Sequence, residues 1–214
     1  MTTKFLKHLV LAFSLMVLSF MVSSPSFGQG SSGRFSDTHN IYMRMGFNKG
    51  NYVLGFNTDL NYIYKNKYSA QIGYSGFFKH AESEPSDYSI GLLELFTFGV
   101  TRAYDQVHNW NLMVGRVLPL NDSETLRLHI RGGAAYSRRL IPTNWSDENT
   151  FGLAENYVYD YDKNIRAAFV INVELEWAYL SFTGNSVDGV FMVHDDQVYF
   201  GLGLSGSLGL LRSR

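Results

Sequence analysis

The sequence predicts an all-β chain that closes into an antiparallel up-and-down barrel of about eight strands. Residues 125–136 and 164–177 carry this prediction, because apolar side chains alternate there with polar or small ones. A period of two over such a length indicates a β-strand with one apolar and one polar face. The same alternation recurs along most of the chain, which has 15% aromatic residues and 20 glycines.

The composition excludes several kinds of site. The chain has no cysteine, which rules out disulfides, cysteine nucleophiles and zinc–thiolate centres. Its net charge is −1, and it lacks the basic patch that a nucleic-acid partner would need. No stretch beyond the N-terminal segment is long and apolar enough for a transmembrane helix. We expect no cofactor.

The N-terminus has the composition of a signal peptide. Lys4 and Lys7 form a basic start, residues 9–22 are apolar, and small residues allow cleavage near Gly28. A single membrane anchor is the alternative, because the apolar run is long for a signal peptide. The expected organisation is a signal peptide, a flexible lead-in and one β-barrel domain: residues 1–28, 29–37 and 38–214.

Eight strands are expected in chain order. In the second, an uncharged row that begins at Tyr52 alternates with a polar row, and turn signals at residues 48–50 and 65–66 flank it. Glu94 falls on the apolar row of the fourth strand, which predicts a β-bulge or a local change of register. Residues 179–193 could add two strands, making ten. The expected ranges are residues 40–47, 52–64, 68–78, 88–104, 108–118, 125–136, 164–177 and 197–210.

Alternation alone does not decide which face lies outside, but the chemistry of the two rows does. The polar row is mostly Gly, Ser, Ala, Asn and Thr, and a closed barrel of about eight strands has room inside for side chains only. Aromatic residues at strand ends fit the girdles of a membrane barrel. We therefore expect a transmembrane barrel with the polar row inside. The aromatic residues are Tyr52, Tyr62, Tyr64, Tyr68, Tyr88, Tyr136 and Trp177.

The signal peptide, the alternations in residues 52–64, 125–136 and 164–177, and the final strand from Val198 resemble small bacterial outer-membrane β-barrel proteins of the OmpA and OmpX type. The resemblance implies a Gram-negative bacterium and a porin-like barrel in its outer membrane after cleavage near Gly28. It also implies insertion by the barrel assembly machinery and polar loops that face outward.

Two polar connections are expected, residues 184–196 and the longer residues 141–163. The longer one is rich in Asn, Asp, Glu and Tyr, and a connection of this length is functional, mobile or both. Its aromatic residues could form a binding surface or pack onto the barrel rim. If the first strand starts in the periplasm, the strand count places this connection on the periplasmic side.

One charged constellation lies on the polar rows. It comprises Arg127, His129 and Arg131 in one strand with Glu174 and Glu176 in the next. If these strands are neighbours, opposite charges meet inside the barrel as a salt-bridge network. The alternative is a proton-relay or lipid-headgroup site centred on His129. Further polar residues could extend the network: Asn57, Asp59, Asn61 and Glu94.

Catalytic and metal signals are poor. The chain has no Gly-x-Ser-x-Gly, no His-Glu-x-x-His and no phosphate loop, so we assign no catalytic residue. Residues 160–164 resemble the opening of a calcium loop. Ile165 stands where that loop needs glycine and Ile171 where it needs glutamate, so we expect no metal.

The sequence thus predicts a monomeric outer-membrane barrel with a structural or interaction role and no open pore. Its expected contacts are outer-membrane lipids and an unknown extracellular or periplasmic partner. One alternative is an outer-membrane enzyme that modifies lipid A. The other is a soluble periplasmic β-barrel that binds a small apolar ligand, with the two faces reversed.

Overall fold

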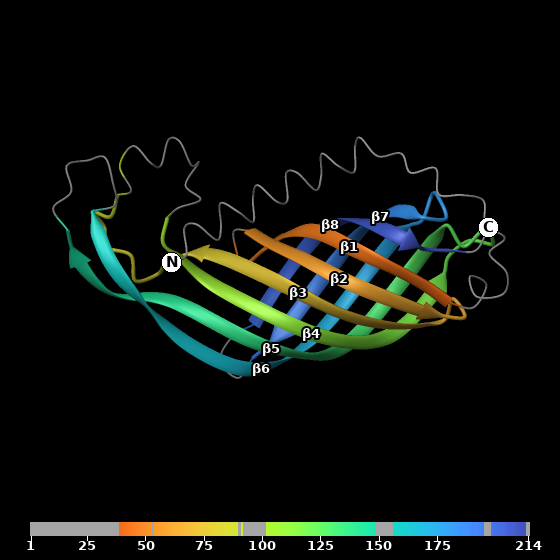
Figure 1. Cartoon of the computed structure of the whole chain (residues 1–214), viewed down its shortest axis with the longest axis horizontal. Coiled ribbons are helices and arrows are strands. Elements are labelled where there is room, and N and C mark those ends of the chain that lie inside the picture. The colour runs from red at the N-terminus through yellow and green to blue at the C-terminus, as the bar shows by residue number, and fades with distance from the viewer. Residues whose placement is uncertain are drawn as a thin grey trace.

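The computed structural model describes residues 39–52, 54–89, 91, 102–148, 156–194 and 198–212. In these residues eight antiparallel strands follow one another around a closed barrel, and β8 pairs with β1 (Figure 1). The predicted all-β, up-and-down fold is confirmed. Within the described residues, no helix is long and apolar enough to span a membrane. The strands are β1 (His39–Gly50), β2 (Leu54–Tyr64), β3 (Tyr68–His80), β4 (Tyr104–Pro119), β5 (Leu126–Asp147), β6 (Tyr157–Trp177), β7 (Thr183–Val193) and β8 (Val198–Leu210).

The strand expected at residues 88–104 does not stand between β3 and β4, and Tyr104 is the one described residue of this range that lies in a strand, as the first residue of β4. β3 pairs directly with β4 from Tyr68–Arg116 to His80–Tyr104, which leaves no place for a strand between them. Residues 90 and 92–101, including the bulge expected at Glu94, lie outside the described residues. The described residues just before Tyr104 are not in a strand.

The strand that brings the ring to eight is β7, and most of it lies in residues 184–196, which were expected to be a polar connection. β7 has little contrast between its faces. Its outward row starts with Thr183 and Asn185, and its inward row ends with Val190 and Met192. A strand that is polar on both sides at one end and apolar on both sides at the other lacks the period-two signal.

The connection expected at residues 141–163 is largely strand. β5 continues to Asp147 and β6 begins at Tyr157, with Asp147 opposite Tyr157 and a register shift between Thr143 and Ser146. Past Leu140, β5 has no pairing with β4. This part of β5 and the start of β6 therefore form a two-stranded ribbon, the β5–β6 ribbon, that extends beyond the neighbouring strands (Figure 1).

The two ends of the barrel differ in their connections. At the end where β1 begins and β8 stops, all three connections are short: residues 65–67, 120–125 and 178–182. The opposite end has two short connections, residues 51–53 and 194–197, and both longer ones. Lys65 and Asn66 both have positive φ (53° and 49°), as a tight type I′ hairpin turn requires. The longer connections, residues 81–103 and 148–156, lie at the opposite end. The expectation that placed the β5–β6 connection at the end of the termini is wrong, because it counted residues 88–104 as a strand.

The polar row faces the lumen and the apolar row faces outward, as predicted. In β1, Tyr42 and Arg44 are buried, whereas Ile41 and Phe47 are exposed. Two aromatic residues expected in the outer girdles are placed differently. Tyr52 precedes β2 and is buried in the lumen, 4.9 Å from Tyr199 between ring centroids. Tyr88 is buried in the β3–β4 connection.

Candidate functional site

The five residues singled out in the sequence lie on two neighbouring strands. β5 carries Arg127, His129 and Arg131, and β6 carries Glu174 and Glu176. The register places Arg127 opposite Glu176 and His129 opposite Glu174. All five residues are at most 1% exposed. The structure therefore brings them together inside the barrel.

Glu176 interacts with two of these residues, Arg127 and His129, through one carboxylate oxygen. Arg127 donates to Glu176 Oε2 through Nη2 (2.7 Å) and Nε (3.1 Å). Its Nη1 donates to the carbonyl oxygen of Leu211 (2.7 Å). His129 Nε2 lies 2.9 Å from the same carboxylate oxygen of Glu176. Because Leu211 directly follows β8, Arg127 ties the end of the last strand to β5 and β6.

The hydrogen bonds determine the protonation of His129. A guanidinium has only donors, so Arg131 Nη2, 2.8 Å from His129 Nδ1, must donate to that nitrogen. Nε2 then carries the hydrogen and donates to Glu176. His129 is therefore a neutral imidazole held between a cation and an anion. Both of its ring nitrogens are occupied, which leaves neither for a substrate.

Three further charged residues join the cluster from other strands. Arg44 on β1 donates to Asp59 on β2 (2.7 Å), and its Nη1 lies 2.9 Å from Glu174. Glu174 also accepts a hydrogen bond from Arg131. Asp188 on β7 lies 3.8 Å from Arg44. Glu174 thus bridges Arg44 of β1 and Arg131 of β5, two strands that lie across the barrel from each other.

The sequence predicts a place in the lumen for some of these three residues and not for others. Asp59 was expected as a possible extension, and the polar row of β1 carries Arg44, so alternation was a usable signal for both. Asn57, also expected, donates to Asp59 (2.9 Å), and Asn61 is fully buried. No alternation in the sequence marks Asp188 as facing the lumen, because both faces of β7 are mixed.

The buried charges are nearly balanced. With His129 neutral, the cluster holds three guanidiniums and four carboxylates. An isolated buried charge is costly, whereas paired and hydrogen-bonded charges can be enclosed. We call this set the lumen cluster: Arg44, Arg127, Arg131, Asp59, Glu174, Glu176, Asp188 and His129.

Apolar side chains fill the lumen on both sides of the lumen cluster. Toward the termini lie Tyr42, Ile63, Val117, Ala178 and Leu211. A charged layer between two apolar layers binds the strands together across the lumen. The layer toward the longer connections comprises Tyr52, Phe77, Val107, Met113, Ala135, Ala168, Val170, Met192 and Tyr199.

This arrangement bears on the alternatives from the sequence. A soluble barrel with reversed faces is wrong, since the charged row lies inside and the apolar row outside. A site for substrate at His129 conflicts with its complete burial. Within the described ranges, no group of three or more His, Asp or Glu side chains is placed to hold a metal ion.

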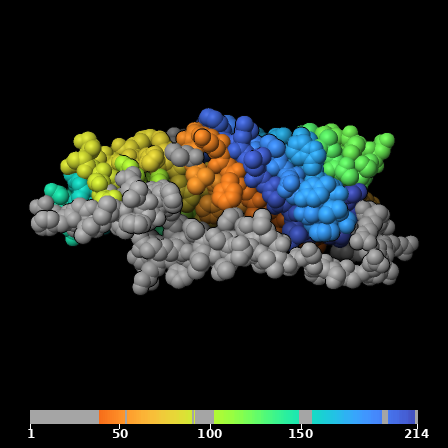
Figure 2. All heavy atoms as spheres, turned by 90° about the horizontal axis from the view of Figure 1, so that it is seen from above, coloured from red at the N-terminus to blue at the C-terminus, as the bar shows by residue number. Residues whose placement is uncertain are grey.

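The second candidate site lies outside the barrel wall, where the β3–β4 connection packs on the β5–β6 ribbon. Ser83 Oγ donates to the carbonyl oxygen of Pro142 (2.6 Å) and accepts from Trp145 Nε1 (3.2 Å). Asn156 donates to the Asp87 carbonyl oxygen (2.9 Å). Figure 2 shows the connection (yellow) and the ribbon (teal) together at one end of the molecule, with the β4–β5 turn (green) at the other.

Aromatic rings form the centre of this contact. The ring of Trp145 lies 5.2 Å from Tyr88 and 4.8 Å from Tyr159, between centroids. The Tyr157 hydroxyl donates to Asp87 (2.9 Å), and this hydrogen bond raises the pKa of Tyr157 above its ordinary value. A two-stranded ribbon alone is marginal in water, so the packing of the connection explains how it stays ordered.

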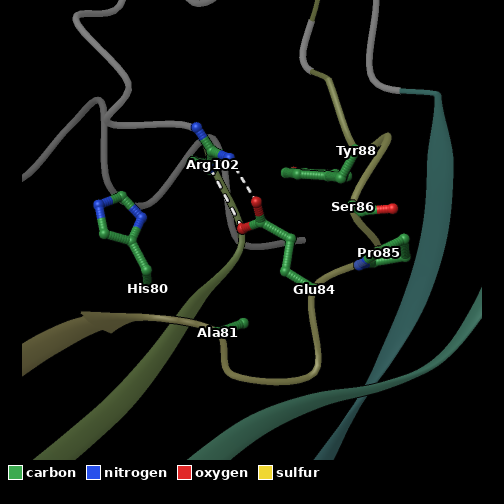
Figure 3. Close-up of a pocket in the computed structure, with 7 residues that line it drawn as sticks. All are labelled: His80, Ala81, Glu84, Pro85, Ser86, Tyr88 and Arg102. Atoms are coloured by element: carbon green, nitrogen blue, oxygen red, sulfur yellow. Dashed lines mark hydrogen bonds and ion pairs between the residues drawn. The ribbon is translucent and has the colours of Figure 1, made fainter.

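A depression of about 420 Å³ lies in the β3–β4 connection. Its one arginine, Arg102, forms an ion pair with Glu84 and lies 5.6 Å from the ring centre of Tyr88, with His80 on the opposite wall (Figure 3). This cation is already paired, so among the described residues that line the depression no unpaired arginine or lysine is available to attract an anion.

The fold and the lumen define a closed eight-stranded barrel with a charged interior and an apolar exterior, the architecture of small bacterial outer-membrane barrels. No family model and no curated protein matches the sequence. Similar solved structures include the N-terminal β-barrel domain of Pseudomonas aeruginosa OprF, with TM-score 0.48, 7% identity and coverage of 79% of this chain and 96% of that one.

Two other structures are comparable. Ail, the attachment invasion locus protein of Yersinia pestis, has TM-score 0.47 and 13% identity, with 81% of this chain and 98% of that chain covered. Neisserial surface protein A has TM-score 0.44 and 7% identity, with 79% and 96% covered. At these values the similarity is one of shape, and it carries no function over to this chain.

Proposed function

We propose that this protein is a bacterial outer-membrane β-barrel with a structural or interaction role. The observation that carries the proposal is the outer surface, where large apolar side chains are exposed on all eight strands. Leu202 and Leu204, for example, are 72% and 69% exposed. A continuous apolar belt of this extent is unsuited to water and fits the hydrocarbon core of a bilayer.

Aromatic side chains flank the apolar belt at both ends, as expected at two membrane interfaces. Near the termini, the Arg116 guanidinium lies 4.8 Å from the ring centre of Tyr68. This stacking lets the cation reach the headgroup region while its stem stays on apolar surface. The two groups are Tyr64, Tyr68, Trp177 and Tyr179 near the termini, and Trp110, Tyr136, Phe169 and Phe200 toward the longer connections.

The filled lumen favours an anchor over a channel. The lumen cluster and the apolar layers around it occupy the interior that a transported solute would need. What distinguishes this barrel is the β5–β6 ribbon with the β3–β4 connection packed on it. We infer that this ribbon is the part that meets a partner.

The orientation follows from the usual asymmetry of such barrels, which have short periplasmic turns and longer external loops. The ribbon then faces the cell exterior and the termini face the periplasm. This proposal includes removal of residues 1–28 near Gly28, insertion by the barrel assembly machinery and a monomeric barrel. Residues 1–38 lie outside the described residues.

Membrane fractionation tests the location. We expect the full-length chain, expressed in a Gram-negative host, to fractionate with the outer membrane. Its mobility on an SDS gel should change on boiling, because a closed barrel held by a buried ionic cluster resists the detergent until it is heated. Recovery in the soluble fraction with no mobility change would contradict the proposal.

Site-specific photo-crosslinking tests the interaction role. A photoreactive residue at Val158, which is on the ribbon and 50% exposed, is expected to give protein or glycan adducts on intact cells. The same residue at Leu202, in the apolar belt, should give lipid adducts only. If Val158 also yields lipid adducts alone, the ribbon is not an interaction surface.

A further inference from the structure

A shallow groove runs across the outer face of β4, β5 and β6. It encloses about 570 Å³. Its floor contains Ala134 and Ala167, and its walls include Trp110, Leu112 and Tyr136, each more than half exposed. The groove exists because small residues on β5 and β6 sit among large ones on the same face. Its walls offer almost only apolar surface, which suits a hydrocarbon chain.

Two cations stand at the end of this groove toward the longer connections. Arg138 follows Tyr136 by two residues, on the same face of β5, and its register partner on β6 is Ile165, which also lines the groove. Lys163 follows on the same face of β6. Two residues along a strand correspond to about 7 Å. Arg138 and Lys163 are both exposed.

Neither of these cations forms an ion pair with a described carboxylate. Among the described residues, no carboxylate lies within 4 Å of Arg138 or Lys163, in contrast to the arginines of the lumen cluster. The neighbour of Arg138 on β4, His108, bonds to Tyr74 and Gln106 and adds no carboxylate. A guanidinium binds a phosphate through paired hydrogen bonds, and an ammonium adds a point charge.

We propose that the groove and these two cations form a binding site for one anionic lipid. An acyl chain lies in the groove, and the headgroup phosphate contacts Arg138 and Lys163. The site rests on the proposed membrane location and deepens it, because it names a lipid class and a place on the barrel. The leaflet is the one on the side of the longer connections.

Trp110 provides the readout, since it lines the groove. The full-length protein carrying Trp145→Phe and Trp177→Phe has one tryptophan. It is reconstituted in phosphatidylcholine vesicles that contain a small fraction of brominated phosphatidylglycerol or, in a parallel sample, brominated phosphatidylcholine. We expect the apparent affinity for the brominated anionic lipid to be about tenfold higher, because two cations near a membrane surface each favour an anionic lipid.

Two sets of variants separate charge from shape. Arg138→Gln with Lys163→Gln should remove the preference for phosphatidylglycerol. Ala134→Leu with Ala167→Leu should fill the groove and weaken quenching by either lipid. The matched control is Gly206→Leu on β8, where an added Cβ meets no clash and its nearest neighbour, Asn185 Oδ1, lies 3.9 Å away. That variant should behave like the unaltered chain.

The outcomes distinguish this inference from the proposed function. Equal quenching by the two brominated lipids in an inserted, heat-modifiable barrel would overturn the lipid site and leave the membrane location intact. Failure of the unaltered chain to insert would overturn the membrane location itself. A preference that survives Arg138→Gln with Lys163→Gln would also contradict the assignment of these cations.

Discussion

Glu174→Gln is expected to lower the free energy of unfolding by about 3–5 kcal/mol, the cost of removing one partner from a buried ion pair. Glu174 accepts a hydrogen bond from Arg131 and lies 2.9 Å from Arg44 Nη1, and all three residues are buried. The amide keeps the shape but not the charge, so two guanidiniums lose their common counter-ion. Urea unfolding in phospholipid vesicles, followed by tryptophan fluorescence, measures the change.

Asp188→Asn is the matched control, because it makes the same chemical change in the same layer of the lumen. Asp188 lies 3.8 Å from its nearest guanidinium and is the fourth carboxylate against three arginines. Its amide can keep the hydrogen bond with Ser205. We expect a change of about 1 kcal/mol or less. Equal losses for the two variants would show that the pairing of Glu174 with Arg44 and Arg131 contributes no more to stability than the distant contact of Asp188.

The sequence predicts the inside and the outside of this barrel well, because both follow from one alternation. On β5 the row of Arg127 is buried and the row of Ile130 is exposed, as period two requires. The same parity identifies which charges share the lumen. Charged side chains on one face of long strands can be satisfied only where opposite charges are supplied together.

The sequence fails where the two faces of a strand meet similar surroundings. The β5–β6 ribbon extends beyond the neighbouring strands, so both of its faces are polar or mixed, and its sequence has the pattern of a loop. β7 has mixed faces as well. Conversely, residues 88–104 alternate in sequence, yet β3 pairs directly with β4, so no strand lies between them and only Tyr104 of this range is a described strand residue. Alternation of polar and apolar side chains therefore indicates that the two faces of a strand have different surroundings, and a strand whose faces have similar surroundings lacks it.

The contacts within the lumen cluster lie beyond sequence reasoning for a different reason. They depend on register and on closure, which bring Arg44 of the first strand next to Glu174 of the sixth. No local pattern encodes that distance. The neutral state of His129 likewise follows from Arg131, which lies on the same strand but acts through the geometry of its side chain.

Adjacent glycines on β5 are expected to respond oppositely to the same substitution. Gly133 faces inward, and a Cβ there would lie 2.0 Å from the carbonyl oxygen of Leu112 and 2.7 Å from the Cα of Met113. Both are backbone atoms of β4, so no side-chain rotation relieves the clash. Gly133→Ala should therefore force β4 and β5 apart and lower the free energy of unfolding by about 1–3 kcal/mol or more.

Gly132→Ala tests the same chemistry one residue away. Its Cβ would lie 3.9 Å from the carbonyl oxygen of Val170 and 4.0 Å from the ring of Phe169, which are ordinary van der Waals distances. The added methyl also restricts the unfolded chain, so we expect no loss and a gain of up to about 1 kcal/mol. Urea unfolding of both variants in vesicles measures the difference. If Gly133→Ala unfolds at the same urea concentration as Gly132→Ala, β4 and β5 do not approach as closely as their backbones indicate.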